Sequence, residues 1–115
     1  ESIQAYEALL QIDPEHQWAK GVSIYRNLGQ AYFYEKKYKQ ALNYLLKGLE
    51  LEDIEPADLA DLHLEIGYNY YGLGSYKQAA QHIREYLKLS DPKAPERSKA
   101  MEYLVYANEW LARKK

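Results

Sequence analysis

Histidines are the side chains in this 115-residue chain with the widest range of chemistry, and there are three: His16, His63 and His82. They lie far apart in the sequence and lack the spacing of metal ligands on one helix. His63 also falls on the packing face of its expected helix, where a structural role is the default. The chain has no Cys, which removes thiolate chemistry and disulfides. The histidines therefore predict no metal site.

Other catalytic signals are equally weak. The carboxylates are spread along expected helix surfaces, and no nucleophile motif, phosphate-binding loop or dinucleotide fingerprint occurs. Short basic clusters at 36–39 and 113–115 do not suffice for nucleic acid on a chain of net charge −2. We expect no enzymatic activity, no cofactor and no nucleic-acid partner.

Aromatic side chains offer a different chemistry, the recognition of another protein. Tyr occurs 13 times against a single Phe. Tyr103, Tyr106 and Trp110 recur at i, i+3 and i+7, which places them on one face of a helix. Rings supply apolar area, and phenol groups can meet the polar groups of a peptide backbone. The alternative is that such a stripe is core between helices.

A segment that occurs twice supplies the elements that position these side chains. Residues 27–41 read NLGQAYFYEKKYKQA, and residues 65–79, 38 positions later, read EIGYNYYGLGSYKQA. Gly29 aligns with Gly67, and the run Tyr-Lys-Gln-Ala is identical in both copies. A period of about 20 to 50 residues indicates stacked supersecondary units.

Apolar residues spaced at i, i+3/i+4 and i+7 predict that these units are helical. Pro14 ends the first helix near Asp13. Lys36 stands in the turn where the second copy has Gly74, so a left-handed conformation there would carry strain of about 1 kcal/mol. We expect helices over about residues 3–13, 15–35, 38–52, 56–73, 76–89 and 95–113.

The order Leu/Ile-Gly-x-x-Tyr, then Tyr-x-x-Ala, then an apolar run before Asp resembles the tetratricopeptide repeat. The resemblance implies an all-α fold, a right-handed superhelical array of antiparallel helix pairs (an α-solenoid) with six helices, in which Gly29 and Gly67 let paired helices approach closely. It implies one domain of a half repeat (1–14), two repeats (15–53 and 54–92) and a terminal half repeat or capping helix (93–115). Because the chain opens inside an amphipathic pattern without Met, we expect it to be a fragment of a longer repeat protein.

In this family the first helices of successive repeats line the concave face. The resemblance places there, as candidate partner-binding residues, Asn27, Gln30, Phe33, Tyr34, Leu64, Glu65, Tyr68, Tyr71, Tyr103, Tyr106 and Trp110. Partner contact and burial in the core stay alternatives for Tyr34, Tyr68, Tyr71 and Tyr106. Packing is expected for Tyr32, Tyr38, Tyr70 and Tyr76.

The last helix has two alternative registers. The preferred one continues the 38-residue period, puts Val105 at the position of Gly67, and predicts a packing stripe that includes Met101. The other puts Ala107 at the glycine position and Trp110 at the Tyr32 position.

Some family members grip a C-terminal carboxylate with a Lys/Asn/Asn/Lys/Arg set. The corresponding positions here are Arg26, Gln30, Glu65, Lys99 and Tyr103. Glu65 would repel a carboxylate, so we expect no such clamp. Arg26 and Lys99 are expected to be solvated charges, and Glu65 to favour a ligand with a basic residue.

The sequence thus predicts a protein–protein interaction module that binds a peptide or partner helix in the concave face. The alternative is an assembly scaffold that self-associates, or stacks on further repeats, through its open ends, and a regulatory domain fused to another protein is a third reading. No apolar run approaches the roughly 18 residues of a membrane span, and nothing resembles a signal peptide. A cytoplasmic location is favoured, although the compartment stays open.

Overall fold

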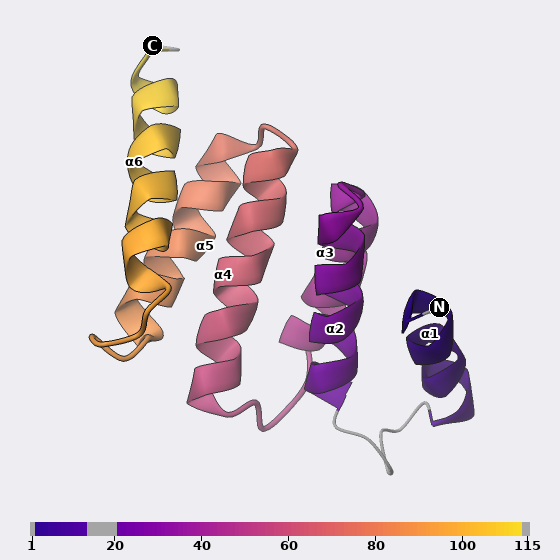
Figure 1. Cartoon of the computed structure of the whole chain (residues 1–115). Helices are drawn as coiled ribbons and strands as arrows, with labels where there is room; N and C mark the ends of the chain where they lie inside the picture. The colour runs from indigo at the N-terminus through magenta and orange to yellow at the C-terminus, as the bar shows by residue number, and fades with distance from the viewer. Residues whose placement is uncertain (1, 14–20, 114–115) are drawn as a thin grey trace.

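Figure 1 shows the computed structural model, which describes residues 2–13 and 21–113. Six helices and no strand are found in these two stretches, as the all-α prediction requires. Their bounds are α1 (Ser2–Ile12), α2 (Gly21–Tyr34), α3 (Tyr38–Leu49), α4 (Pro56–Gly72), α5 (Tyr76–Leu89) and α6 (Arg97–Arg113). The expected start of the second helix at residue 15 lies outside the described residues.

Two helix ends differ from the expected bounds. α3 ends at Leu49, three residues early, and Asp53 in the following linker has a left-handed φ of 58°, which a continuing helix cannot contain. α6 begins at Arg97 instead of 95, after a turn in which the Asp91 carbonyl accepts the Ala94 N–H and the Asp91 carboxylate accepts the Lys93 N–H. Local hydrogen bonding in the linkers thus shortens both helices.

The helices stand side by side in chain order and form an elongated array of 47 × 28 × 21 Å (Figure 1). α2 packs on α3 and α4 on α5, while α4 also touches both α2 and α6. Such neighbour-only packing is typical of repeat arrays, whose stability is close to a sum of repeat and interface contributions. None of the described helices is both long and apolar enough to cross a membrane.

The apolar core consists of two clusters that share α4. Buried residues of the first cluster are Val22, Leu42, Leu45, Leu62 and Ile66. Those of the second are Ala60, Leu64, Ile83, Tyr86 and Ala100. α4 therefore stabilises both interfaces of the array, because it packs against the preceding pair of helices and against the following one.

The repeated glycines sit where two helices approach closely, as predicted. A Cβ atom at Gly67 would lie 2.7 Å from Cγ1 of Ile83 and 3.3 Å from the backbone oxygen of Ala79. At Gly29 it would lie 2.5 Å from the Leu45 side chain. A side chain at either position would displace the facing side chain, and at Gly67 it would also press on the backbone of α5.

The two intra-repeat turns are equivalent down to their hydrogen bonds. Lys36 adopts the left-handed conformation with a φ of 61°, and Gly74 has a φ of 81°. The third N–H after each helix bonds back to the last turn of that helix: the Lys37 N–H donates to the Tyr32 carbonyl and the Ser75 N–H to the Tyr70 carbonyl, both at 2.9 Å. Lys36 thus occupies a conformation that suits glycine.

Contacts of α6 favour the register that continues the 38-residue period. Gln30 donates to Glu65 across the α2–α4 interface, and the residues 38 positions later, Tyr68 and Tyr103, have ring centroids 4.8 Å apart across the α4–α6 interface. In that register Val105 occupies the glycine position.

Met101 and Val105 are nevertheless 52% exposed, because within the described residues no helix follows α6 to cover them. The prediction that Met101 belongs to the buried stripe is therefore wrong, whereas Ala100 and Ala107 of the same stripe are fully buried.

Candidate partner-binding groove

A groove of about 410 Å³ opens along α2, α4 and α6, the helices that the resemblance assigned to the concave face. We call it the α2–α4–α6 groove. Seven of the predicted binding residues line it: Gln30, Phe33, Tyr34, Leu64, Glu65, Tyr68 and Tyr103. The other lining residues are Arg26, Gly29, Asp61, Asn69, Glu96 and Lys99.

Three further predicted residues lie around a separate hollow of about 190 Å³. Tyr71, Tyr106 and Trp110 line it together with Tyr76, Glu109 and Arg113. Tyr76 was expected only to pack, yet its ring lies 5.2 Å from that of Trp110 at this hollow. Asn27 lines neither site. The predicted set is thus divided between two sites.

Rings link the groove across all three helices. Phe33 of α2 lies 6.4 Å from Tyr68 of α4, whose ring lies 4.8 Å from that of Tyr103 of α6. Tyr71 also approaches Tyr103, edge to face at 4.8 Å. Tyr34 at the rim is 79% exposed. Phe33, Tyr34, Tyr68 and Tyr103 form what we call the aromatic zone of the groove.

The Tyr68 ring packs against its neighbours and also lines the groove, so its position is compatible with either alternative that the sequence left open. Its hydroxyl is buried and has no hydrogen-bond partner among the described residues. Burial raises the pKa of this phenol well above its ordinary value, and the nearby negative charge of Glu96 adds to the rise. The wall of the groove therefore contains an unsatisfied polar group.

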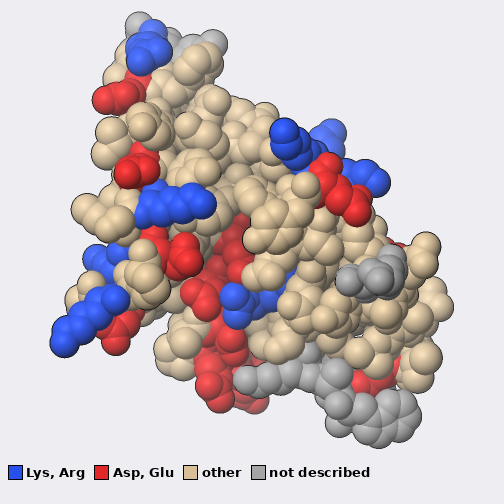
Figure 2. All heavy atoms as spheres, viewed as in Figure 1, with Lys and Arg blue, Asp and Glu red and all other residues tan. Residues whose placement is uncertain are grey.

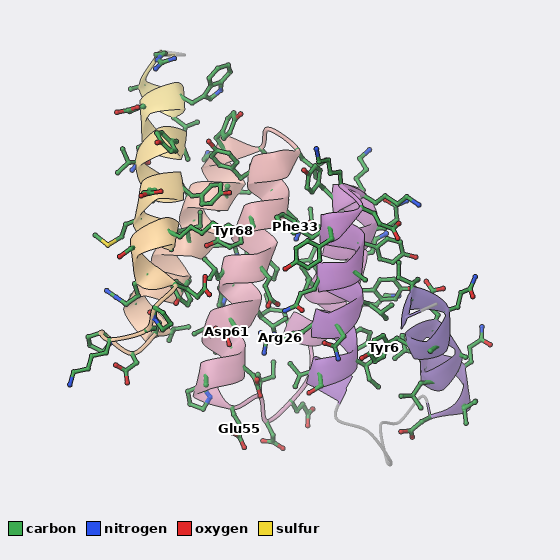
Figure 3. The ribbon with its side chains drawn as sticks, viewed as in Figure 1. Tyr6, Arg26, Phe33, Glu55, Asp61 and Tyr68 are labelled. Atoms are coloured by element: carbon green, nitrogen blue, oxygen red, sulfur yellow. The ribbon has the colours of Figure 1, made fainter. Side chains whose placement is uncertain are left out.

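The opposite end of the groove is charged. The Arg26 guanidinium donates to Glu65 at 2.9 and 3.1 Å and to Asp58 at 3.3 Å, and Asp61 lies 3.5 Å away. Gln30 also donates to Glu65, at 3.0 Å. Figure 3 shows Arg26 and Asp61 facing each other between α2 and α4, with Phe33 and Tyr68 further along the same two helices.

The expectation that Arg26 is a solvated charge is wrong. Its side chain is 24% exposed, and the hydrogen bond to Glu65 is the main cause that raises its pKa, against the effect of burial. Because Arg26 and Glu65 satisfy each other, Arg26 cannot serve a ligand carboxylate without losing these bonds. This arrangement supports the prediction that the carboxylate clamp is absent.

Comparison with known families settles what this array of helices is. Two family models described as tetratricopeptide repeat match residues 22–53 and 60–92, which together cover more than half of the chain. The chain belongs to the tetratricopeptide repeat family. Proteins of this family generally mediate protein–protein interaction through a non-catalytic helical fold. A search of curated protein sequences finds no match to this chain.

The second repeat also carries a polar pair that the sequence did not predict. His63 of α4 and His82 of α5 bring their Nδ1 atoms to 3.0 Å, and Tyr70 stacks on His82. Burial lowers the pKa of both imidazoles. His16 lies outside the described residues, within which no group of three metal-ligating side chains occurs.

The first helix is attached to the array through a shared carboxylate. Tyr32 of α2 and Tyr44 of α3 donate to Oε2 of Glu7 at 3.0 and 2.7 Å. Burial, followed by this hydrogen bond, raises the pKa of Tyr44 to about 12. Tyr32 therefore packs between helices, in agreement with its predicted role, and Glu7 fixes α1 against them.

Proposed function

We propose that this tetratricopeptide repeat domain binds a peptide or a helix of a partner protein in the α2–α4–α6 groove. The observation that carries the proposal is the continuous line of rings in this groove, beside a buried Tyr68 hydroxyl without a partner in the described chain. Aromatic anchors dominate protein–protein binding because they bury a large area and lose few rotamers.

The scaffold beneath the groove is suited to hold such anchors in place. Gly67, next to Tyr68, fixes the distance between α4 and α5, and the Arg26–Glu65 pair connects α2 to α4. A ligand would therefore meet side chains whose positions are set before binding, which lowers the entropic cost of association.

The exposed ring of Tyr34 provides the sharpest test, because its removal should leave the packed rings in place. Tyr34→Ala should weaken binding of a groove ligand about tenfold, a typical loss for an aromatic contact at an interface. The ligand can be a peptide selected from a randomised display library, with its affinity measured by fluorescence polarisation.

Met101→Ala is the matched control, since Met101 is also a large exposed side chain but lies on the free face of α6. It should leave the affinity unchanged. Equal losses in both variants, or a loss only at Met101, would contradict binding in the groove. Circular dichroism of each variant checks that the helices persist.

The free face of α6 supports a second candidate, self-association or stacking on further repeats. Met101 and Val105 are exposed there, and Val105 stands at the position that packs against the second helix in the other repeats. If this face binds another copy, sedimentation should show dimers whose fraction rises with concentration and falls in Val105→Glu. A monomer at every concentration would exclude self-association.

A further inference from the structure

The α2–α4–α6 groove carries a charge pattern with a fixed distance to its aromatic zone. A charged residue precedes an aromatic one by seven positions three times: Arg26 and Phe33 on α2, Asp61 and Tyr68 on α4, and Glu96, directly before α6, and Tyr103 on α6. All six residues line the groove. Seven residues are two helical turns, so the charged and aromatic positions are about 10 Å apart.

We call Arg26, Asp61, Glu65, Glu96 and Lys99 the charged zone. Together with the adjoining Asp58, it has four carboxylates for two cations, and one of these cations, Arg26, is shared among three carboxylates. Carboxylates gather in a band along the middle of this face, with a cationic side chain against them (Figure 2). The charged zone is therefore short of positive charge.

Asp61 is the carboxylate that Arg26 neutralises least. It lies 3.5 Å from the guanidinium, compared with 2.9 Å for Glu65, and its side chain is the most exposed of the three. Burial raises the pKa of Asp61, Arg26 opposes the rise, and Asp58 and Glu96 add to it. A second cation beside Asp61 and Glu96 would relieve this repulsion.

A second observation also points to a ligand in this groove. Asn69 is 1% exposed and lines the groove, and its amide group donates to the Glu65 carbonyl at 2.8 Å. The side-chain oxygen of Asn69 has no hydrogen-bond partner among the described residues, and neither has the Tyr68 hydroxyl beside it in sequence. An unpaired acceptor and an unpaired hydroxyl suit the N–H and C=O groups of a peptide backbone.

The unpaired groups of Asn69 and Tyr68 favour an extended ligand over a helical one. Inside a helix the main-chain N–H and C=O groups bond to each other, whereas an extended segment leaves them available to the Asn69 oxygen and the Tyr68 hydroxyl. An extended chain advances about 3.3 Å per residue, so about three residues span the distance between the zones. The groove therefore fits an extended segment.

We propose that the ligand is an extended peptide segment with an Arg or Lys side chain in the charged zone and, about three residues away, a bulky apolar side chain in the aromatic zone. This inference rests on the proposed function. It specifies a basic ligand, which suits the net negative charge of the groove, and it excludes acidic peptides as ligands.

Selection from a randomised phage-displayed peptide library tests it directly. The domain should enrich peptides that pair a basic residue with an aromatic or large aliphatic residue at about that spacing. A peptide so selected is then the probe for fluorescence polarisation. Asp61→Asn with Glu96→Gln should weaken binding of the selected peptide about five- to tenfold, because two partly exposed charge interactions are lost. The affinity of the wild-type domain should also fall with added salt.

The matched control is Glu50→Gln with Glu102→Gln, which removes two exposed carboxylates that do not line the groove. It should leave the affinity nearly unchanged. Equal losses in both double variants would show a general effect of net charge and would overturn the inference.

Other outcomes separate this inference from the proposed function. Selected peptides that need Tyr34 but show no basic preference would overturn the inference and leave groove binding intact. A preference for basic and apolar residues seven positions apart would overturn the extended conformation. Selection of no peptide, or of peptides insensitive to Tyr34→Ala, would contradict both proposals.

Discussion

The buried hydroxyl of Tyr68 should destabilise the free domain, and Tyr68→Phe removes it. A polar group buried without a partner loses its hydrogen bonds to water and gains none in the protein, which costs about 1 to 3 kcal/mol. The hydroxyl has no partner among the described residues, while the ring keeps its contacts with Phe33 and Tyr103 in the variant. We expect the free energy of unfolding to rise by about 1 kcal/mol.

Tyr86 provides a control of opposite sign in the same fold. Tyr86 is fully buried, and its hydroxyl is hydrogen-bonded to the side chain of Ser90, which in turn accepts from Arg97 at 2.7 Å. Tyr86→Phe removes a satisfied bond and should lower the free energy of unfolding by about 1 kcal/mol.

Urea unfolding followed by circular dichroism measures both changes, with equal slopes as the check on two-state behaviour. In thermal unfolding the same changes correspond to shifts of about 4 °C, upward for Tyr68→Phe and downward for Tyr86→Phe. Loss of stability in both variants would refute the reasoning, because it would mean that the Tyr68 hydroxyl has a partner in solution. A gain in stability only in Tyr68→Phe would show that the buried Tyr68 hydroxyl destabilises the free domain.

Two further predictions concern the His63–His82 pair and the turn at Lys36. Burial lowers the pKa of both imidazoles, so below about pH 6.5 the unfolded chain binds more protons than the folded one. The urea midpoint should therefore be constant above about pH 6.5 and fall below it. His63→Gln with His82→Gln should flatten this dependence. A midpoint that rises on acidification would contradict the lowered pKa values. Lys36→Gly should raise the free energy of unfolding by about 1 kcal/mol because it relieves a φ of 61°, and an unchanged urea midpoint would show that Lys36 is not strained.

Positions that repeat could be predicted from the sequence because they meet the same surroundings twice. Gly29 and Gly67 each face the second helix of their own repeat, and Lys36 and Gly74 each close the same turn. Equivalent surroundings favour the same residue, so a residue that recurs after 38 positions indicates the same structural environment in both repeats. The helices and turns of the fold follow from this recurrence and from the apolar spacing.

Polar pairs between helices could not be predicted in the same way. Arg26 and Glu65 are 39 residues apart, and His63 and His82 are 19 apart, so neither pair has a local spacing signal. Whether Arg26 is solvated or paired depends on the rotation of α2 against α4 to within one side chain, which apolar periodicity does not fix. The division of the predicted binding residues between two hollows has the same origin.

Equivalent positions of successive repeats that carry different residues affect the direction in which a ligand would bind. Gln30 and Glu65 form a hydrogen bond across the α2–α4 interface, whereas their counterparts 38 residues later, Tyr68 and Tyr103, are rings in contact across the α4–α6 interface. Equivalent positions are thus polar between the first two helices of the groove and aromatic between the last two. A ligand with its basic side chain beside Asp61 therefore has polar neighbours between α2 and α4 and aromatic neighbours between α4 and α6. A peptide bound in the opposite chain direction would lose either its charge pairing or its ring contacts.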